Sequence, residues 1–187
     1  MTTEKLPKNL FYIHGYQSSP DGEKGRLFQT ALHAQAIQYR TCPPEELVIS
    51  ECLAQISQTI PHDQSCCLIG SSLGGFLAAK TALTHHNIDQ LILLNPAIIP
   101  PGTNLDEHIS VPRSILQDMT EPTLFSTPLS ATLTILRGTD DDVVPDSWII
   151  PFAKAQQATI QFVHDDHRFS RNLSTLPLII TDILTKT

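Results

Sequence analysis

The chain has 187 residues, of which 41% are hydrophobic and 17% are charged, proportions typical of a globular protein about the size of one domain. Its formal net charge of -7 comes from acidic residues spread along the chain, so the sequence does not favour nucleic-acid binding. No apolar stretch approaches the roughly 20 residues that span a bilayer, and the first ten residues do not resemble a secretory signal. We therefore expect a cytoplasmic protein without a membrane partner.

Short apolar runs that end near Gly, Asn or Pro alternate with segments of helical period. The expected strands are Leu10 to Ile13, Ala36 to Tyr39, Cys66 to Ile69, Gln90 to Leu94, Thr132 to Leu136 and Thr159 to Val163. The expected helices are Gly25 to Gln35, Pro44 to Ile60, Leu73 to His85, Ser147 to Gln157 and a last one near the C-terminus. This alternation predicts an α/β fold in which crossover helices flank a mostly parallel sheet of about six strands.

One segment breaks this alternation. Residues 96–130 are rich in Pro, Thr and Ser, have weak periodicity, and are too long for an ordinary connection in a compact domain. We interpret residues 1–187 as a single domain in which residues 96–130 form a lid or cap, because no repeat or flexible linker divides the chain.

The strongest local signal is a G-x-S-x-G sequence that follows the expected strand Cys66 to Ile69 and leads into a helix. A sharp turn between strand and helix leaves no room for neighbouring side chains, which explains glycine at positions 70 and 74. The turn would expose Ser72 as a nucleophile at the start of the helix, where the Leu73 amide can stabilise an oxyanion. The alternative is an ordinary Gly/Ser-rich loop.

A serine nucleophile needs a histidine base and usually a carboxylate that orients the histidine. Asp141 follows the strand Thr132 to Leu136 and is the candidate acid, although its acidic loop also fits a solvated turn or a helix cap. Two histidines follow the last strand, and we favour His167 over His164 as the base. The order Ser, Asp, His along the chain is the order found in α/β-hydrolases.

A second oxyanion donor is expected after the first strand, where a His-Gly step exposes backbone amides and the Tyr16 amide is the candidate. Apolar residues near these loops could line an acyl pocket, and core packing is equally compatible with each of them. They are Tyr16, Phe76, Ile98, Ile99, Phe125 and Phe169, with Phe76, Ile98 and Phe169 the preferred substrate contacts.

Several short motifs together resemble the YqiA-like esterases, a compact branch of the α/β-hydrolase superfamily. They are Tyr12-Ile13-His14-Gly15, Ser18-Ser19-Pro20, Gly70-Ser71-Ser72-Leu73-Gly74-Gly75, Asn95-Pro96-Ala97, Asp141 and His167-Arg168-Phe169. The resemblance implies a serine esterase or thioesterase with Ser72 as nucleophile, Asp141 as acid, His167 as base and Tyr16 as an oxyanion donor. It does not extend to Thr103–Pro128, where no family motif aligns.

The sequence thus predicts a serine hydrolase that cleaves a small ester or thioester through an acyl-enzyme. No metal and no organic cofactor are expected, because the four cysteines lack metal-ligand spacing and the chemistry needs neither. Two alternatives stay open: a serine peptidase or protein deacylase with the same triad, and a non-catalytic binding protein on the same scaffold. The oligomeric state has no readable determinant in the sequence.

Overall fold

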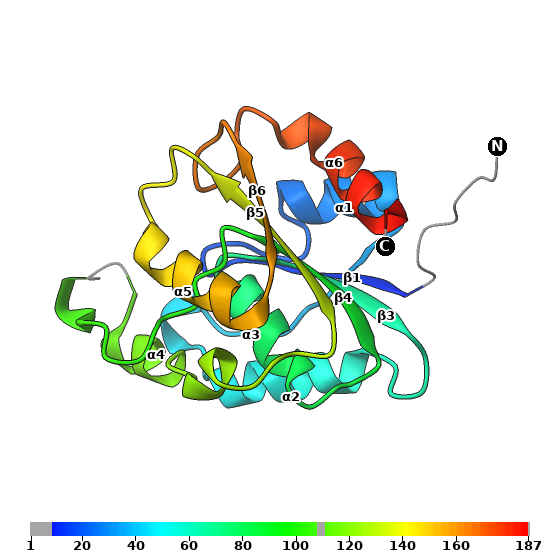
Figure 1. The fold of residues 1–187 in the computed structure, drawn as a ribbon. Helices are drawn as coiled ribbons and strands as arrows, with labels where there is room; N and C mark the ends of the chain where they lie inside the picture. The colour runs from blue at the N-terminus through cyan, green and yellow to red at the C-terminus, as the bar shows by residue number, and fades with distance from the viewer. Residues whose placement is uncertain (1–8, 108–110, 187) are drawn as a thin grey trace.

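The computed structural model describes residues 9–107 and 111–186, in which six parallel strands form one sheet (Figure 1). The strand order is β2-β1-β3-β4-β5-β6, and every neighbouring pair is parallel. The strands are β1 (Leu10–Ile13), β2 (Gln35–Ala36), β3 (Cys66–Ser71), β4 (Ile88–Leu94), β5 (Thr132–Gly138) and β6 (Thr159–Val163). The predicted α/β class and the six-stranded parallel sheet are confirmed.

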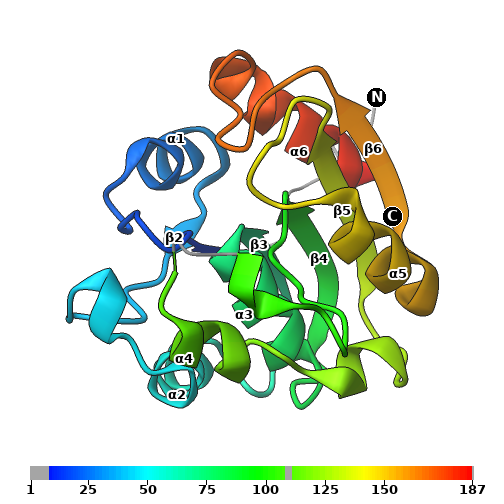
Figure 2. The same cartoon turned by 90° about the vertical axis from the view of Figure 1, so that its left-hand side faces the viewer.

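Helices cover both faces of this sheet, as the two views of the ribbon show (Figures 1 and 2). On one face lie α1 (Glu23–Leu32) and α6 (Leu176–Thr185). On the other lie α2 (Ile49–Thr59), α3 (Leu73–Ala82) and α5 (Asp146–Gln156). This three-layer arrangement is the one expected when right-handed crossovers join parallel strands.

Alternating side chains along the strands divide the core into two apolar clusters, one on each face. In β1, Phe11 and Ile13 belong to the cluster beneath α2, α3 and α5, whereas Leu10 and Tyr12 belong to the cluster beneath α1 and α6. Because both faces are covered, the strands are nearly continuous apolar runs, which is why their positions can be read from the sequence.

Most element ends differ by one to three residues from the sequence prediction, and two elements differ more. The second strand comes earlier and is shorter, at Gln35–Ala36, although Ile37 and Tyr39 beyond it are buried. The long helix expected from Pro44 is divided into a short 3₁₀ turn, Pro44–Glu46, and the helix Ile49–Thr59. Ile37 and Tyr39 are buried alternately, as in a strand, although only Gln35 and Ala36 pair with β1. This alternation explains why the strand was expected further along the chain.

The segment 96–130 is made of short helical turns, η2 (Leu105–Glu107), α4 (Arg113–Asp118) and η3 (Pro122–Phe125). Its apolar side chains join the core cluster beneath α2, α3 and α5; they are Ile98, Ile99, Ile115, Leu116, Met119 and Leu124. An ion pair of 2.9 Å between Lys80 and Glu121 fixes it to α3. Residues 108–110 of the predicted lid lie outside the described residues, and a lid function stays a prediction.

The carboxyl ends of the parallel strands meet at one edge of the sheet. The loops that leave β1, β3, β5 and β6 at this edge carry Tyr16, Ser72, Asp141 and His167, respectively. This edge is where open α/β sheets commonly bind ligands. In the described ranges, no helix combines the length and the apolar character that crossing a bilayer requires.

Candidate active site

Ser72 lies at the sharp turn between β3 and α3 and has a backbone conformation that is unusual for a residue with a side chain. Its φ is 54° and its ψ is -118°. Such a conformation persists only where the surrounding structure fixes it. Here the Ser72 amide donates to the Leu94 carbonyl at 3.0 Å, and the Ser72 carbonyl accepts from the amides of Gly75 and Ala97 at 2.9 and 3.0 Å.

The glycines around Ser72 are required by close contact between backbones. A Cβ on Gly74 would lie 2.1 Å from the Ile13 carbonyl oxygen, and a Cβ on Gly70 would lie 2.5 Å from the Gly74 oxygen. Neither contact can be relieved by a side-chain rotation, since both partners are backbone atoms. The prediction that Gly70 and Gly74 make room for the turn is confirmed.

His167 and Asp141 form a hydrogen-bonded pair at the same edge of the sheet. The Nδ1 of His167 lies 3.0 Å from the Oδ2 of Asp141, whose side chain is fully buried, while 17% of the His167 side chain is exposed. A carboxylate can only accept, so Nδ1 donates and Nε2 of the neutral ring is left to accept a proton. His164, the alternative base, is 80% exposed in its side chain and lies beside Asp140 instead.

The environment of Asp141 favours its ionised form. Burial alone would raise the pKa of this carboxyl, but hydrogen bonds from His167 and from the Val143 and Val144 amides outweigh burial and hold the pKa below its ordinary value. Arg137, which is itself buried, adds an ion pair to Oδ2 at 2.5 Å. An ionised carboxylate is what the orientation of a histidine base needs.

Asn95 and Arg137 connect the loops that carry the two partners, and sequence reasoning did not assign either of them a role. The side-chain Oδ1 of Asn95 accepts from the Gly138 amide at 2.8 Å, and its Nδ2 donates to the backbone carbonyls of Asp166 and His167 at 3.2 and 3.1 Å. Arg137 also donates to Asp146 at 2.8 Å. The feature that marks Asn95 is full burial at a positive φ, and this feature is recognisable only once the fold is known.

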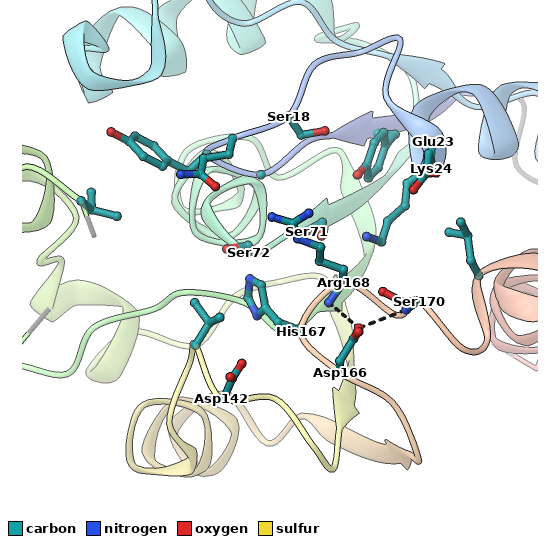
Figure 3. A pocket seen from close by; sticks show the side chains of 17 residues that line it. Ser18, Glu23, Lys24, Ser71, Ser72, Asp142, Asp166, His167, Arg168 and Ser170 are labelled. Atoms are coloured by element: carbon teal, nitrogen blue, oxygen red, sulfur yellow. Dashed lines mark hydrogen bonds between the residues drawn. The ribbon is translucent and has the colours of Figure 1, made fainter. Parts of the chain in front are cut away.

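Ser72 and His167 line the same pocket, a cavity of about 750 Å³ at the carboxyl edge of the sheet. In Figure 3 the His167 imidazole points toward Ser72 from the opposite wall. The other lining residues are mostly polar; they include Tyr16, Gln17, Ser18, Lys24, Ser71, Asp142, Asp166, Arg168 and Ser170. A volume of this size suits a small organic molecule.

Tyr16 belongs to the loop after β1, which lies beside Ser72. A Cβ on Gly15 in this loop would lie 3.3 Å from the Ser72 Cβ. Arg40 holds the loop from behind by donating to the Tyr16 and Ser18 carbonyls at 2.8 and 3.0 Å. On the other side, Leu73 begins α3, so its amide has no acceptor within the helix. Leu73 thus directly follows the nucleophile and Tyr16 lies in the loop beside it, and the oxyanion role of their amides stays a prediction.

The three preferred substrate contacts are in the core, and we no longer propose them as pocket residues. Phe76 and Ile98 are buried in the cluster beneath α2, α3 and α5, and Phe169 is buried in the cluster beneath α1 and α6. None of the three lines the pocket. Closeness to a motif in sequence did not decide the direction of these side chains. Phe76, for example, lies in α3, where every residue except Lys80 is buried.

The part of the chain that the structure describes holds no group of three or more His, Cys, Asp or Glu side chains that could bind a metal ion. The four cysteines are free thiols; Cys52, Cys66 and Cys67 are buried. Burial raises the pKa of the Cys52 and Cys66 thiols to about 11, so these two remain protonated at neutral pH.

The parallel sheet and its strand order show that the chain has an α/β-hydrolase fold. Est1E from Butyrivibrio proteoclasticus is similar over 99% of this chain and 89% of its own, with a TM-score of 0.72 and 15% identity. Mouse alpha/beta hydrolase domain-containing protein 10 is similar over 97% and 92%, with a TM-score of 0.69 and 17% identity. Pyrethroid hydrolase PytH is similar over 94% and 97%, with a TM-score of 0.65 and 15% identity.

Within this fold class, the chain belongs to the uncharacterised protein family UPF0227, whose model matches residues 9–181. The match covers all six strands and the four loops at the carboxyl edge. The resemblance to the YqiA-like family, drawn from the motifs, is thereby confirmed. No curated protein matches the chain.

Proposed function

We propose that this protein is a serine hydrolase that cleaves carboxylic esters or thioesters of small or acyl substrates through an acyl-enzyme. The observation that carries this proposal is the combination of Ser72 in a strained turn with the His167–Asp141 pair on the same pocket. The similarity to PytH, which is named a pyrethroid hydrolase, and to mouse alpha/beta hydrolase domain-containing protein 10 supports a hydrolytic reaction on this scaffold.

In the proposed reaction, His167 takes the Ser72 proton as the Ser72 oxygen attacks the ester or thioester carbonyl carbon. The amides of Leu73 and Tyr16 stabilise the oxyanion that forms, and the nearby N-terminus of α3 favours its negative charge. His167 then passes the proton to the departing alcohol or thiol. A water molecule, deprotonated by the same histidine, releases the acid and restores Ser72.

The experiment that tests the proposal measures hydrolysis of short-chain p-nitrophenyl esters and acyl thioesters by the wild type and by Ser72→Ala. We expect turnover by the wild type and a fall in kcat of about 10⁶ for the variant, as is typical when a nucleophile of this kind is removed. Ser71→Ala is the matched control, because Ser71 lines the same pocket without occupying the turn. Turnover by Ser72→Ala at the wild-type rate would exclude Ser72 as nucleophile.

Adding peptide amides and acylated peptides to this substrate panel separates the alternatives. A peptidase or protein deacylase would cleave peptide amides or acylated peptides with a higher kcat/KM than small esters. A binding protein on this scaffold would cleave none of these substrates. The preserved Ser72, His167 and Asp141 arrangement favours catalysis over binding alone.

A further inference from the structure

Two cationic side chains without carboxylate partners face the pocket beside the nucleophile. Lys24 lies in the first turn of α1 and Arg168 directly follows His167; both line the pocket, and Figure 3 shows both side chains directed into it. Elsewhere in the described chain, cations such as Lys80, Arg137 and Arg171 form ion pairs. Among the same described residues, neither Lys24 nor Arg168 forms a side-chain hydrogen bond or ion pair.

The position of Lys24 is unfavourable for a cation. Lys24 lies at the positive end of the α1 dipole, where a cation is repelled. Burial lowers the pKa of its ammonium most and Arg168 lowers it further, while Asp166, Glu23 and Asp165 raise it, with a net downward shift. Because Lys24 and Arg168 line one pocket, an anion bound there would reduce their mutual repulsion and part of the desolvation cost of Lys24.

Three carboxylates also line this pocket, and within the described residues none of them forms an ion pair with Lys24 or Arg168. Asp166 lies nearby, but its Oδ1 accepts from the Arg168 and Ser170 amides at 2.9 and 3.0 Å, so backbone donors hold it in place (Figure 3). Glu23 and Asp142 also line the pocket, and both are exposed to solvent, which screens their charges. The pocket thus combines the half-buried Lys24 and the exposed Arg168, which form no ion pair within the described residues, with carboxylates that are held by backbone amides or exposed to solvent.

From this geometry we propose that the substrate carries an anionic group, a carboxylate or a phosphate, that binds Lys24 and Arg168 while its reacting carbonyl lies at Ser72. This inference rests on the proposed hydrolase function and specifies its substrate class. Arginine binds planar oxyanions through two parallel hydrogen bonds, and lysine supplies a point charge to the same group.

The test compares matched esters with and without a negative charge. For an anion on the acyl side, 4-nitrophenyl hydrogen glutarate is compared with 4-nitrophenyl 5-methylhexanoate, in which an isopropyl group replaces the carboxylate. For an anion on the leaving group, 4-carboxyphenyl acetate is compared with 4-carbamoylphenyl acetate. The measured quantity is the ratio of kcat/KM for the anionic ester to kcat/KM for its neutral match.

We expect this ratio to fall about ten- to a hundredfold in Lys24→Gln or Arg168→Gln. The fall should occur for the acyl-side pair of esters or for the leaving-group pair, according to which part of the substrate carries the anion. Lys24→Arg, which keeps the charge, should retain most of the preference. Arg26→Gln is the control, because Arg26 is an exposed cation on the same helix that does not line this pocket. Ratios that stay equal in the wild type and both glutamine variants, in both arms, would overturn the proposal.

Binding of glutarate, measured by isothermal titration calorimetry, separates this inference from the proposed function. If the wild type hydrolyses no ester, the hydrolase proposal fails, and the anion site is then judged by binding alone. Glutarate that binds the wild type, and binds Lys24→Gln about tenfold more weakly, would support the site. Absence of binding to the wild type would overturn it.

Discussion

Several contacts hold the Asp141 carboxylate in the position from which it can orient His167. It accepts from His167 and from two backbone amides, and it pairs with Arg137. In Asp141→Asn, the amide retains the shape of the carboxylate but removes its charge and allows the wrong imidazole tautomer. We expect kcat to fall by about 10⁴, with KM changed much less, in steady-state kinetics on a p-nitrophenyl ester.

Asp140→Asn is the control for this substitution, because Asp140 is the neighbouring carboxylate and its partners are Arg171 and Thr139 rather than His167. Its kcat should stay within a factor of about two of the wild type, since an exposed ion pair contributes little. An equal loss in both variants would show that the acidic loop, not the Asp141–His167 hydrogen bond, determines the activity.

At the scale of elements, the site depends on how the loop after β1 is held against the start of α3. The Arg40 guanidinium donates to the carbonyls of Tyr16, Ser18 and Cys42, and the Tyr39 hydroxyl donates to the His14 carbonyl at 3.1 Å. Arg40 contacts backbone and not the pocket, so we interpret it as a positioning residue for the Tyr16 amide.

In Arg40→Met, the loop after β1 loses the two hydrogen bonds to Tyr16 and Ser18, while the apolar stem of the side chain is largely kept. Complete loss of one oxyanion donor costs about 10²- to 10³-fold in kcat, so a loosened donor should cost roughly tenfold, with a smaller change in KM. Kinetics and thermal unfolding measured together distinguish this from general destabilisation. If kcat is unchanged in a folded Arg40→Met, the loop is not positioned by Arg40.

Folding stability of the whole molecule should depend on pH through a buried histidine. His14 is 1% exposed, its ring stacks on Tyr39 at 4.3 Å, and burial lowers its pKa to about 4 from an ordinary 6.5. Between these two values the unfolded chain binds a proton at this position and the folded protein does not. The free energy of unfolding should therefore fall by up to about 3 kcal/mol as pH drops from 6.5 to 4, with no contribution from His14 above that range.

Urea unfolding of the wild type and of His14→Phe at pH 7, 6, 5 and 4.5 measures this contribution. The variant keeps an aromatic ring against Tyr39 but cannot bind a proton, so its stability should decline less steeply over the same interval. Parallel curves for the two proteins would show that His14 is not the group responsible.

Much of this architecture was predictable because its causes are local. Strands buried on both faces are nearly continuous apolar runs, and the glycines beside Ser72 are fixed by backbone contacts that recur wherever a strand turns sharply into a helix. The family match confirms the resemblance that these motifs suggested. The placement of Ser72, Asp141 and His167 at one edge follows from parallel strands, once the strands are identified.

The features that the sequence did not reveal depend on side chains far apart in the chain. Asn95 joins β5 to the loop that carries His167, a contact between residues 72 positions apart. The three apolar residues expected in the pocket point into the core, because the direction of a side chain is set by packing on both faces of the sheet and not by the nearest motif. The polar, partly cationic pocket lining likewise appears only when the loops after β1 and β6 are brought together.

Covalent labelling of the nucleophile tests the central claim most directly. A fluorophosphonate probe reacts with a serine that is activated by a neighbouring base, and digestion followed by mass spectrometry identifies the labelled residue. We predict one adduct, on Ser72, which is retained in Ser71→Ala and abolished in Ser72→Ala and His167→Ala. An adduct on another serine, or undiminished ester hydrolysis by a protein whose Ser72 stays unlabelled, would contradict the account.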